Sequence, residues 1–123
     1  MKLKTLMIIK AFVCLGFGPL LLFFPAQLLN VLGTTFGTGA ALTAREYGAS
    51  LFGNLFLTWL AKDSKDSTAR RAIVWHLFIY DGIALVATVM ILFSGGLNLL
   101  GWGIAAVYLF FTIGFGRFLP RED

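Results

Sequence analysis

Residues 82 to 116 read GIALVATVMILFSGGLNLLGWGIAAVYLFFTIGFG, which is a run of 35 residues without a charged side chain. About 20 apolar residues are enough for a helix to cross the hydrocarbon layer of a membrane, so this run holds most of two crossings. A second charge-free run covers residues 11 to 44 and is 34 residues long. Because helices in soluble cores do not need runs of this length, the sequence predicts an integral membrane protein.

The composition of the whole chain agrees with that prediction. Of its 123 residues, 59% are hydrophobic and 13% are charged, and the mean hydropathy is +0.86. Soluble domains carry about 25% charged residues. This composition excludes a disordered chain and a nucleic-acid-binding domain, and the single cysteine, Cys14, excludes a disulfide scaffold. We therefore expect the chain to be surrounded by a lipid bilayer and to have no nucleic-acid partner.

Hydropathy divides the chain into four candidate membrane spans of 19 to 22 residues, at about 6–24, 40–61, 72–93 and 99–118. At about 1.5 Å per residue, each span matches a hydrocarbon layer of roughly 30 Å. The runs are continuous and do not alternate with a period of two, which favours helices over a β-barrel. The predicted fold is all-α: a single transmembrane domain over residues 1–123, built as an integral membrane four-helix bundle.

The loops predict how this bundle is oriented. Residues 62–71 are short and charged, whereas residues 94–98 carry no charge. With four spans, both termini lie on the same side as the charged loop. That side then holds nine of the ten basic residues, with Arg45 as the exception: Lys2, Lys4, Lys10, Lys62, Lys65, Arg70, Arg71, Arg117 and Arg121. The positive-inside rule places both termini in the cytoplasm, and we expect a multi-pass protein of the bacterial inner membrane.

The segment between the first two spans has its own signals. Proline is favoured at the start of a helix and glycine just after its end, so Pro25 and Gly33 bracket a short predicted helix. Its mixture of leucines with Gln27 and Asn30 is typical of a helix that lies flat at the outer membrane interface. Within the first span, Pro19 is expected to kink the helix.

Polar residues recur along the second predicted span. Glu46, Ser50, Asn54 and Thr58 follow one another at four-residue intervals and therefore share one helix face. Because polar groups are costly in lipid, we expect this stripe to turn inward, either as the packing seam of the bundle or as the lining of a ligand or ion pocket. Arg45 lies near the outer end and can extend to the headgroups, whereas the shorter Glu46 needs another partner.

Small residues run beside that stripe at the same interval. Ala44 and Gly48 form one pair, and Ala49 and Gly53 form another. Pairs of small residues four positions apart allow membrane helices to approach closely. We therefore expect a neighbouring helix to pack tightly against the second span.

Asp81 is the strongest single candidate for a functional residue. It lies near the middle of the span 72–93, where a charged residue costs about 2.5–3.5 kcal/mol. It therefore needs a partner, a water-filled cavity or a protonated carboxyl. Counting helix rises places Asp81, Asn54 and Tyr108 at similar depths, about 11–14 Å from the cytoplasmic end. We expect a hydrogen-bonded cluster of these three, acting either as a clamp between helices or as a functional site.

The only histidine, His76, has two readings. Together with Trp75 and Tyr80 it is typical of an aromatic belt at the membrane interface. Alternatively, a neutral imidazole on a membrane helix can be an axial ligand of a haem or chlorin, although bis-histidine ligation within one chain is excluded.

Signatures of known enzymes are lacking. The sequence contains no H-E-x-x-H motif, no G-x-S-x-G motif and no P-loop. We assign no catalytic and no metal-ligating residue, and no cofactor is required by the sequence.

The order of short motifs resembles the DoxX-like group of small bacterial four-helix membrane proteins. The resemblance rests on residues 25–29 with Gly33, on 44–49 (AREYGA), on 69–72 (ARRA) and on Gly101-Trp102. Some members of the wider group are membrane subunits of quinone-linked oxidoreductase complexes. The resemblance therefore implies a small subunit associated with such a complex.

Three functions are compatible with these observations. The first is a structural or accessory subunit of a larger inner-membrane complex, which would have other membrane subunits, or copies of itself, as partners. The second is a binder of a hydrophobic cofactor such as a quinone, a carotenoid or a chlorin, held near Asn54, Asp81 and Tyr108, with His76 as a further candidate. The third is an oligomeric proton-coupled small transporter that works through Glu46 or Asp81.

Overall fold

The computed structural model describes residues 2–34 and 37–119, apart from the side chains of residues 38, 39 and 41. Within these residues the chain is all-helical, with no β-strand and with five helices: α1 (Leu3–Phe23), α2 (Pro25–Val31), α3 (Thr38–Ala61), α4 (Thr68–Phe93) and α5 (Leu100–Gly116). The all-α class is confirmed for this part of the chain. Arg121, which we counted among the cytoplasmic basic residues, lies outside it.

Helices α1, α3, α4 and α5 follow the four apolar runs of the sequence, and α2 follows the predicted short helix. Of these, α1 and α4 are long and apolar enough to cross a membrane, whereas α5 is apolar but has 17 residues. Helix α4 begins four residues before the predicted boundary because Ser67 caps it. The Ser67 hydroxyl accepts a hydrogen bond from the Arg70 backbone N–H at 3.1 Å, which satisfies one of the free donors at the helix start.

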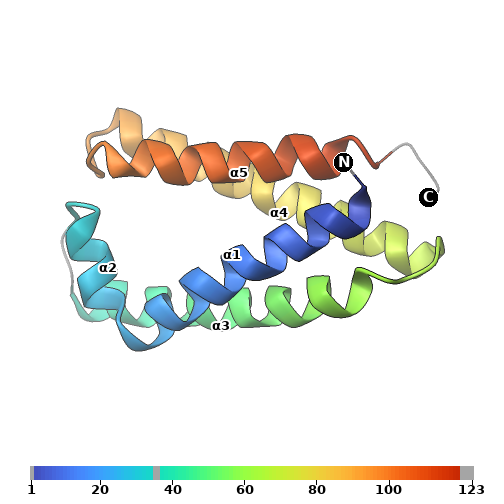
Figure 1. Ribbon diagram of the computed structural model, residues 1–123. Helices are drawn as coiled ribbons and strands as arrows, with labels where there is room; N and C mark the ends of the chain where they lie inside the picture. Colours follow the sequence, from blue (N-terminus) through green and yellow to red (C-terminus); the bar gives the residue numbers. More distant parts are fainter. Residues whose placement is uncertain (1, 35–36, 120–123) are drawn as a thin grey trace.

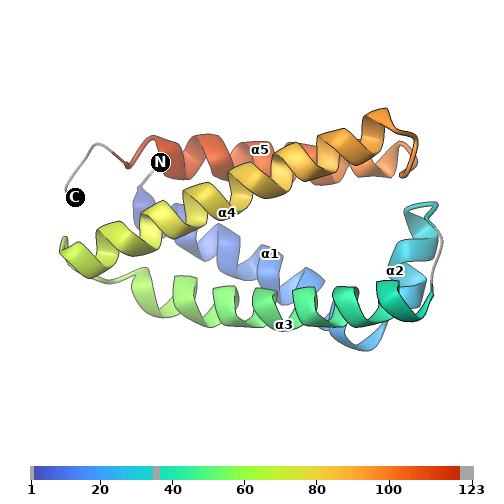
Figure 2. The ribbon, with the colours of Figure 1, turned by 180° about the vertical axis from the view of Figure 1, so that it is seen from behind.

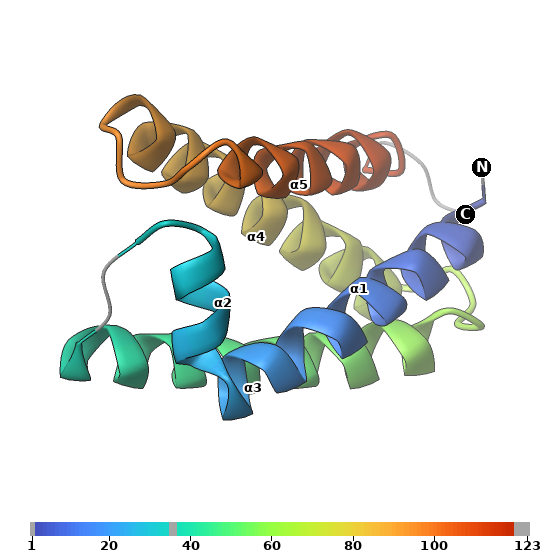
Figure 3. The same ribbon diagram turned by 60° about the vertical axis from the view of Figure 1, so that its left-hand side comes forward.

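The helices form two layers. Helix α1 packs along α3, and α4 packs along α5, as Figures 1 and 2 show from opposite sides. The layers meet where the first half of α1 crosses toward α5. The start of α1, the end of α5 and the α3–α4 connection lie at one end of the molecule, while α2 and the α4–α5 turn lie at the other (Figure 1). The arrangement leaves α2 standing across the far end of the two layers (Figure 3).

The larger apolar core holds the layers together at the end where α1 starts. Its buried residues come from four helices: Leu3, Leu6, Met7, Ala61, Val74, Leu77, Phe111 and Phe115. A smaller core joins α1 to α3 through Cys14, Leu21, Ala44 and Leu51. The larger core therefore joins the two layers at the end where α1 starts, and the smaller core joins only α1 to α3.

The close contact between α1 and α3 depends on Gly48. A Cβ atom at this position would lie 2.8 Å from the Leu22 backbone nitrogen and 3.0 Å from the Gly18 carbonyl oxygen. The predicted small-residue pair at 44 and 48 therefore faces a neighbouring helix. The second pair does not, because Ala49 and Gly53 are exposed and a Cβ at Gly53 meets no atom within 4 Å.

Helix α2 begins at Pro25, as predicted, and its end is closed by Gly33. The glycine has φ = +76°, and the backbone N–H groups of Gly33 and Thr34 donate to carbonyls of the last turn at 3.0 and 3.1 Å. Such a left-handed residue after a helix is the usual position for glycine. Asn98 of the α4–α5 turn then donates to the carbonyl oxygens of Val31 and Leu32, each at 2.9 Å. This contact fixes α2 to the other layer.

Candidate functional site

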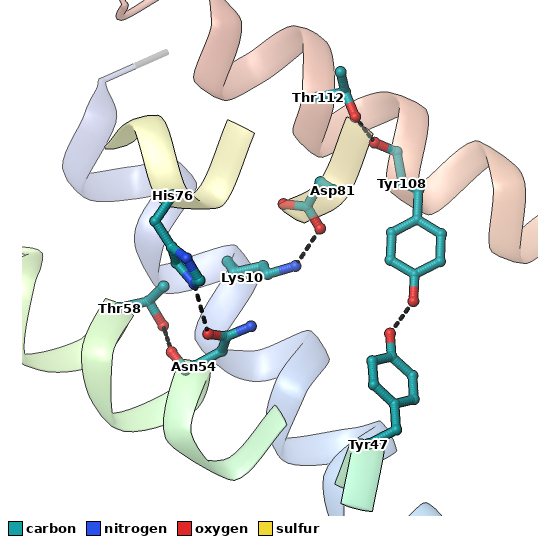
Figure 4. Close-up of polar contacts among 8 residues, drawn as sticks. All are labelled: Lys10, Tyr47, Asn54, Thr58, His76, Asp81, Tyr108 and Thr112. Carbon is teal, nitrogen blue, oxygen red and sulfur yellow. Dashed lines mark hydrogen bonds and ion pairs between the residues drawn. The ribbon is translucent and has the colours of Figure 1, made fainter. Parts of the chain in front are cut away.

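A buried ion pair connects the two layers. The Nζ atom of Lys10 on α1 lies 2.6 Å from Oδ1 of Asp81 on α4, and the two side chains are 3% and 0% exposed (Figure 4). Helix α1 presents Lys10 to the interior because it shares a face with Leu6, Met7 and Cys14, which are buried as well. Buried charges are tolerated when they are paired, so each residue makes the other acceptable in an apolar interior.

This pair corrects one interpretation of the sequence. We had counted Lys10 among the basic residues that mark the cytoplasmic side, and the structure instead places it in the interior. The sequence did contain a signal, because Lys10 falls inside the predicted span 6–24. Charge counting treats every lysine as an exposed marker, and it does not show that an acidic residue 71 positions away lies opposite.

The surroundings of Lys10 leave part of its hydrogen-bonding capacity unused. Its Nζ atom lies 4.7 Å from the centre of the Phe111 ring and 5.5 Å from that of Tyr80, within the range of cation–π attraction. An ammonium group has three N–H donors, and among the described residues Asp81 is its one hydrogen-bond acceptor. In the same part of the chain, Asp81 Oδ2 is buried without a hydrogen-bond partner.

Asn54 and Tyr108, which we expected to join Asp81, take other partners. Oδ1 of Asn54 lies 3.3 Å from Nε2 of His76, which connects α3 to α4. The hydroxyl groups of Tyr108 and Tyr47 contact each other and connect α5 to α3 (Figure 4). Similar depth along a helix does not show which helices are neighbours or which faces meet. The three residues therefore belong to three separate contacts between the layers.

The polar stripe of α3 is divided between the interior and the surface of the chain. Asn54 and Thr58 are buried, and the Thr58 hydroxyl donates to the Asn54 carbonyl oxygen at 2.8 Å. Glu46 and Ser50 are exposed, as is Arg45. The expectation of an inward stripe therefore holds for its second half. In the first half of α3, helix α1 packs against the face that contains Gly48, so the face with Glu46 and Ser50 stays exposed.

Two further buried polar atoms lie in this region. Within the described residues, Nδ2 of Asn54 has no hydrogen-bond partner, and the hydroxyl of Tyr80 lies near Ser50. Tyr80 stacks on Tyr47 with ring centroids 6.5 Å apart, and the rings of His76 and Tyr80 are 5.8 Å apart. His76 and Tyr80 thus form a polar and aromatic strip of α4 that contacts α3, next to Asp81, which contacts α1.

A cavity of about 680 Å³ lies between the layers. Its walls come from all five helices and are mainly aliphatic, and Leu28 and Leu29 contribute from α2. Among the described residues that line the cavity, Lys10 is the one that carries a charge. Tyr47 and Tyr108 also line it. Asn54, His76 and Asp81 are not lining residues. Ligand pockets commonly have volumes of about 300–1,000 Å³, largely apolar walls and a few polar groups. The cavity has these properties.

The charged α3–α4 connection forms a separate, exposed site. Nζ of Lys4 lies 2.8 Å from Oδ1 of Asp63, and Nζ of Lys62 lies 2.8 Å from its Oδ2. The hydrogen bond from Lys4, followed by that from Lys62, lowers the pKa of Asp63 from 3.8 to about 2. The Asp63 carboxylate is fully exposed, so salt screens the ion pair that connects the start of α1 to the loop.

Comparison of the chain with protein-family models, with curated proteins and with solved structures finds no match. The resemblance to the DoxX-like group therefore stays a prediction.

Proposed function

We propose that this chain is a multi-pass protein of the bacterial inner membrane that binds a hydrophobic small molecule between its two helix layers. A quinone, a carotenoid and a chlorin are hydrophobic molecules of this kind. The observation that carries the proposal is the cavity of about 680 Å³, whose mainly aliphatic wall contains one charged side chain, that of Lys10. A wall of this kind excludes a polar metabolite and favours a molecule that partitions from the lipid phase.

The membrane location is supported by the surface of α4. Large apolar side chains are exposed along it, including Ile79, Ile83, Val86 and Met90. Exposed apolar surface on this scale is unfavourable in water and favourable in lipid. The charged residues of the α3–α4 connection lie at the same end as the start of α1, which supports a four-span topology with cytoplasmic termini.

Two glycine positions offer a matched test of the cavity. Gly103 is exposed and lines the cavity, and a Cβ atom there meets no atom within 4 Å, so a phenylalanine at this position can enter the cavity without an initial clash. Gly53 on α3 is equally open but lies on the outside, so Gly53→Phe is the control. The three proteins are purified in mild detergent, and their visible spectra and lipid extracts are compared by mass spectrometry.

The proposal expects a hydrophobic compound that co-purifies with the wild-type chain and with Gly53→Phe and is depleted from Gly103→Phe. A visible absorption band would indicate a carotenoid or a chlorin, and a quinone would be identified by its mass. If the three proteins carry the same compounds in the same amounts, the cavity does not hold a resident ligand and the proposal is wrong.

Assembly into a larger complex is the second candidate function. It is favoured by Arg45 and Glu46, which are charged and exposed on the outer part of α3, where a partner subunit can supply opposite charges. Exposed Ala49 and Gly53 leave room for such a subunit to approach. Purification in mild detergent tests this function, because a stable monomer without any co-purifying protein contradicts it.

A further inference from the structure

The polar groups that line the cavity are rich in hydrogen-bond donors. Of the three N–H donors of Lys10, one is directed to Asp81, and the described residues supply no other acceptor. Its Nζ atom also lies 4.7 Å and 5.5 Å from the centres of the Phe111 and Tyr80 rings, which attract the charge but accept no conventional hydrogen bond. Lys10 also lines the cavity, so a molecule there that reaches Nζ meets an ammonium group with unused donors.

The tyrosine pair adds a second polar group. Tyr47 and Tyr108 both line the cavity, and their hydroxyl groups contact each other. The bond between them uses one hydrogen and one lone pair, so the pair can still donate a hydrogen bond to a ligand or accept one from it. It is therefore compatible with a ligand that accepts hydrogen bonds, and the preference for such a ligand comes from Lys10, which has donors and no acceptor.

The charge balance restricts this acceptor further. Lys10 and Asp81 are 2.6 Å apart and 3% and 0% exposed, so together they form a neutral unit. A carboxylate or phosphate in the cavity would add an uncompensated negative charge to an apolar interior, which is strongly unfavourable. A carbonyl oxygen accepts a hydrogen bond from Lys10 without changing the net charge.

From the donors of Lys10 and the charge balance we infer that the ligand of the cavity is an uncharged long-chain carbonyl compound whose oxygen accepts a hydrogen bond from Lys10 Nζ. The inference rests on the proposed function, because it specifies the polar end of the molecule that the cavity holds. The chain of the ligand lies against the aliphatic wall toward Leu28 and Leu29 of α2. Lys10 fixes the position of the head group, and Asp81 supplies the negative charge that balances the charge of the lysine.

Three probes of similar length separate the contributions of head group and chain. These are methyl undecyl ketone, laurate and tridecane, each titrated into the full-length protein in detergent and followed by native mass spectrometry. A hydrogen bond to a charged donor predicts that the ketone binds about ten- to a hundredfold more tightly than tridecane. Laurate is expected to bind no more tightly than tridecane to the wild-type protein.

Two variants assign these differences to the ion pair. Lys10→Met with Asp81→Leu keeps the cavity neutral and removes the donor, so the ketone and tridecane should bind equally. Asp81→Asn leaves the lysine without a counter-ion, so laurate should become the tightest of the three probes. Circular dichroism and gel filtration establish that each variant is folded. If Asp81→Asn does not fold, the double variant still provides the test.

The outcomes separate this inference from the proposed function. If the wild-type protein binds the ketone and tridecane equally, or laurate most tightly, the inference is wrong while the cavity remains a ligand site. If the double variant still prefers the ketone, Lys10 is not the recognising group and the inference is also wrong. If none of the probes binds, both the inference and the proposed function fail.

Discussion

Removal of Asp81 should destabilise the protein far more than removal of the whole ion pair. At 2.6 Å and an effective dielectric constant of about 20, the attraction between Lys10 and Asp81 is about 6 kcal/mol. Desolvation of each ion costs several kcal/mol, so the intact pair contributes little in net terms. Asp81→Leu abolishes the attraction but leaves Lys10, which is 3% exposed, without a counter-ion. We expect it to lower the free energy of unfolding by about 3–5 kcal/mol.

The double variant is the critical comparison. Lys10→Met with Asp81→Leu replaces both charges by apolar side chains of similar size, and its stability should lie within about 1–2 kcal/mol of the wild-type value or above it. Asp81→Asn keeps an oxygen that accepts a hydrogen bond from Lys10 and should lie between the two. Unfolding is measured in mixed micelles by titration with a denaturing detergent, with helix content from circular dichroism as the signal.

A double-mutant cycle gives the coupling between the two residues directly. If Asp81→Leu is as stable as the wild type, or if the double variant is as unstable as Asp81→Leu, the interior does not depend on the pairing of these charges. Either result would refute the reasoning. A loss of ligand binding with Asp81→Asn, without any loss of stability, would show that Asp81 has a functional role and is more than a clamp between helices.

Three other results are expected. Gly48→Ala should destabilise the protein by about 1–3 kcal/mol, because its Cβ would lie 2.8 Å from the Leu22 backbone nitrogen of α1. Gly53→Ala should be neutral or slightly stabilising, because its Cβ meets no atom within 4 Å. Thermal unfolding of both variants measures the difference. The pKa of Asp63 is lowered, so its ion pairs stabilise the loop above about pH 4 and are lost as the pH falls from 3.8 to about 2. An NMR titration of the Asp63 carboxyl carbon should show a midpoint near 2, and this midpoint should rise in Lys4→Gln. A midpoint near 3.8 in the wild-type protein would show that Asp63 does not form these ion pairs. Asn98→Ala removes the side-chain hydrogen bond to Val31 and should increase amide exchange throughout α2, and unchanged exchange would mean that this contact does not hold the helix.

Local patterns were sufficient to predict the helices. The start of the short helix at Pro25 and its closure at Gly33 follow from the fixed φ of proline and from the freedom of glycine to adopt positive φ. The small-residue pattern predicted the close approach at Gly48 but also one at Gly53, which meets no helix, because the pattern does not show which face of α3 is covered. The early start of α4 depends on a serine cap, which hydropathy does not register.

The partners of the polar residues could not be predicted in this way. Asp81 was recognised as a residue that needs a partner, because a carboxylate in an apolar helix is costly wherever it lies. Its partner, Lys10, was assigned to the surface, and Asn54 and Tyr108 were assigned to Asp81. Each of these assignments requires knowing which helix faces which, and depth along the chain does not contain that information.

Local sequence patterns are enough to predict where the helices lie, the short helix between the first two spans, and the presence of a carboxylate that has to be neutralised. These properties arise from neighbouring residues and from the cost of moving side chains into an apolar medium. The tertiary structure alone decided that α1 pairs with α3 and α4 with α5. It also decided that Lys10 meets Asp81 and that a cavity of about 680 Å³ remains between the layers. Charge pairing and cavity shape depend on residues far apart in the chain, so they exist only once the helices have packed.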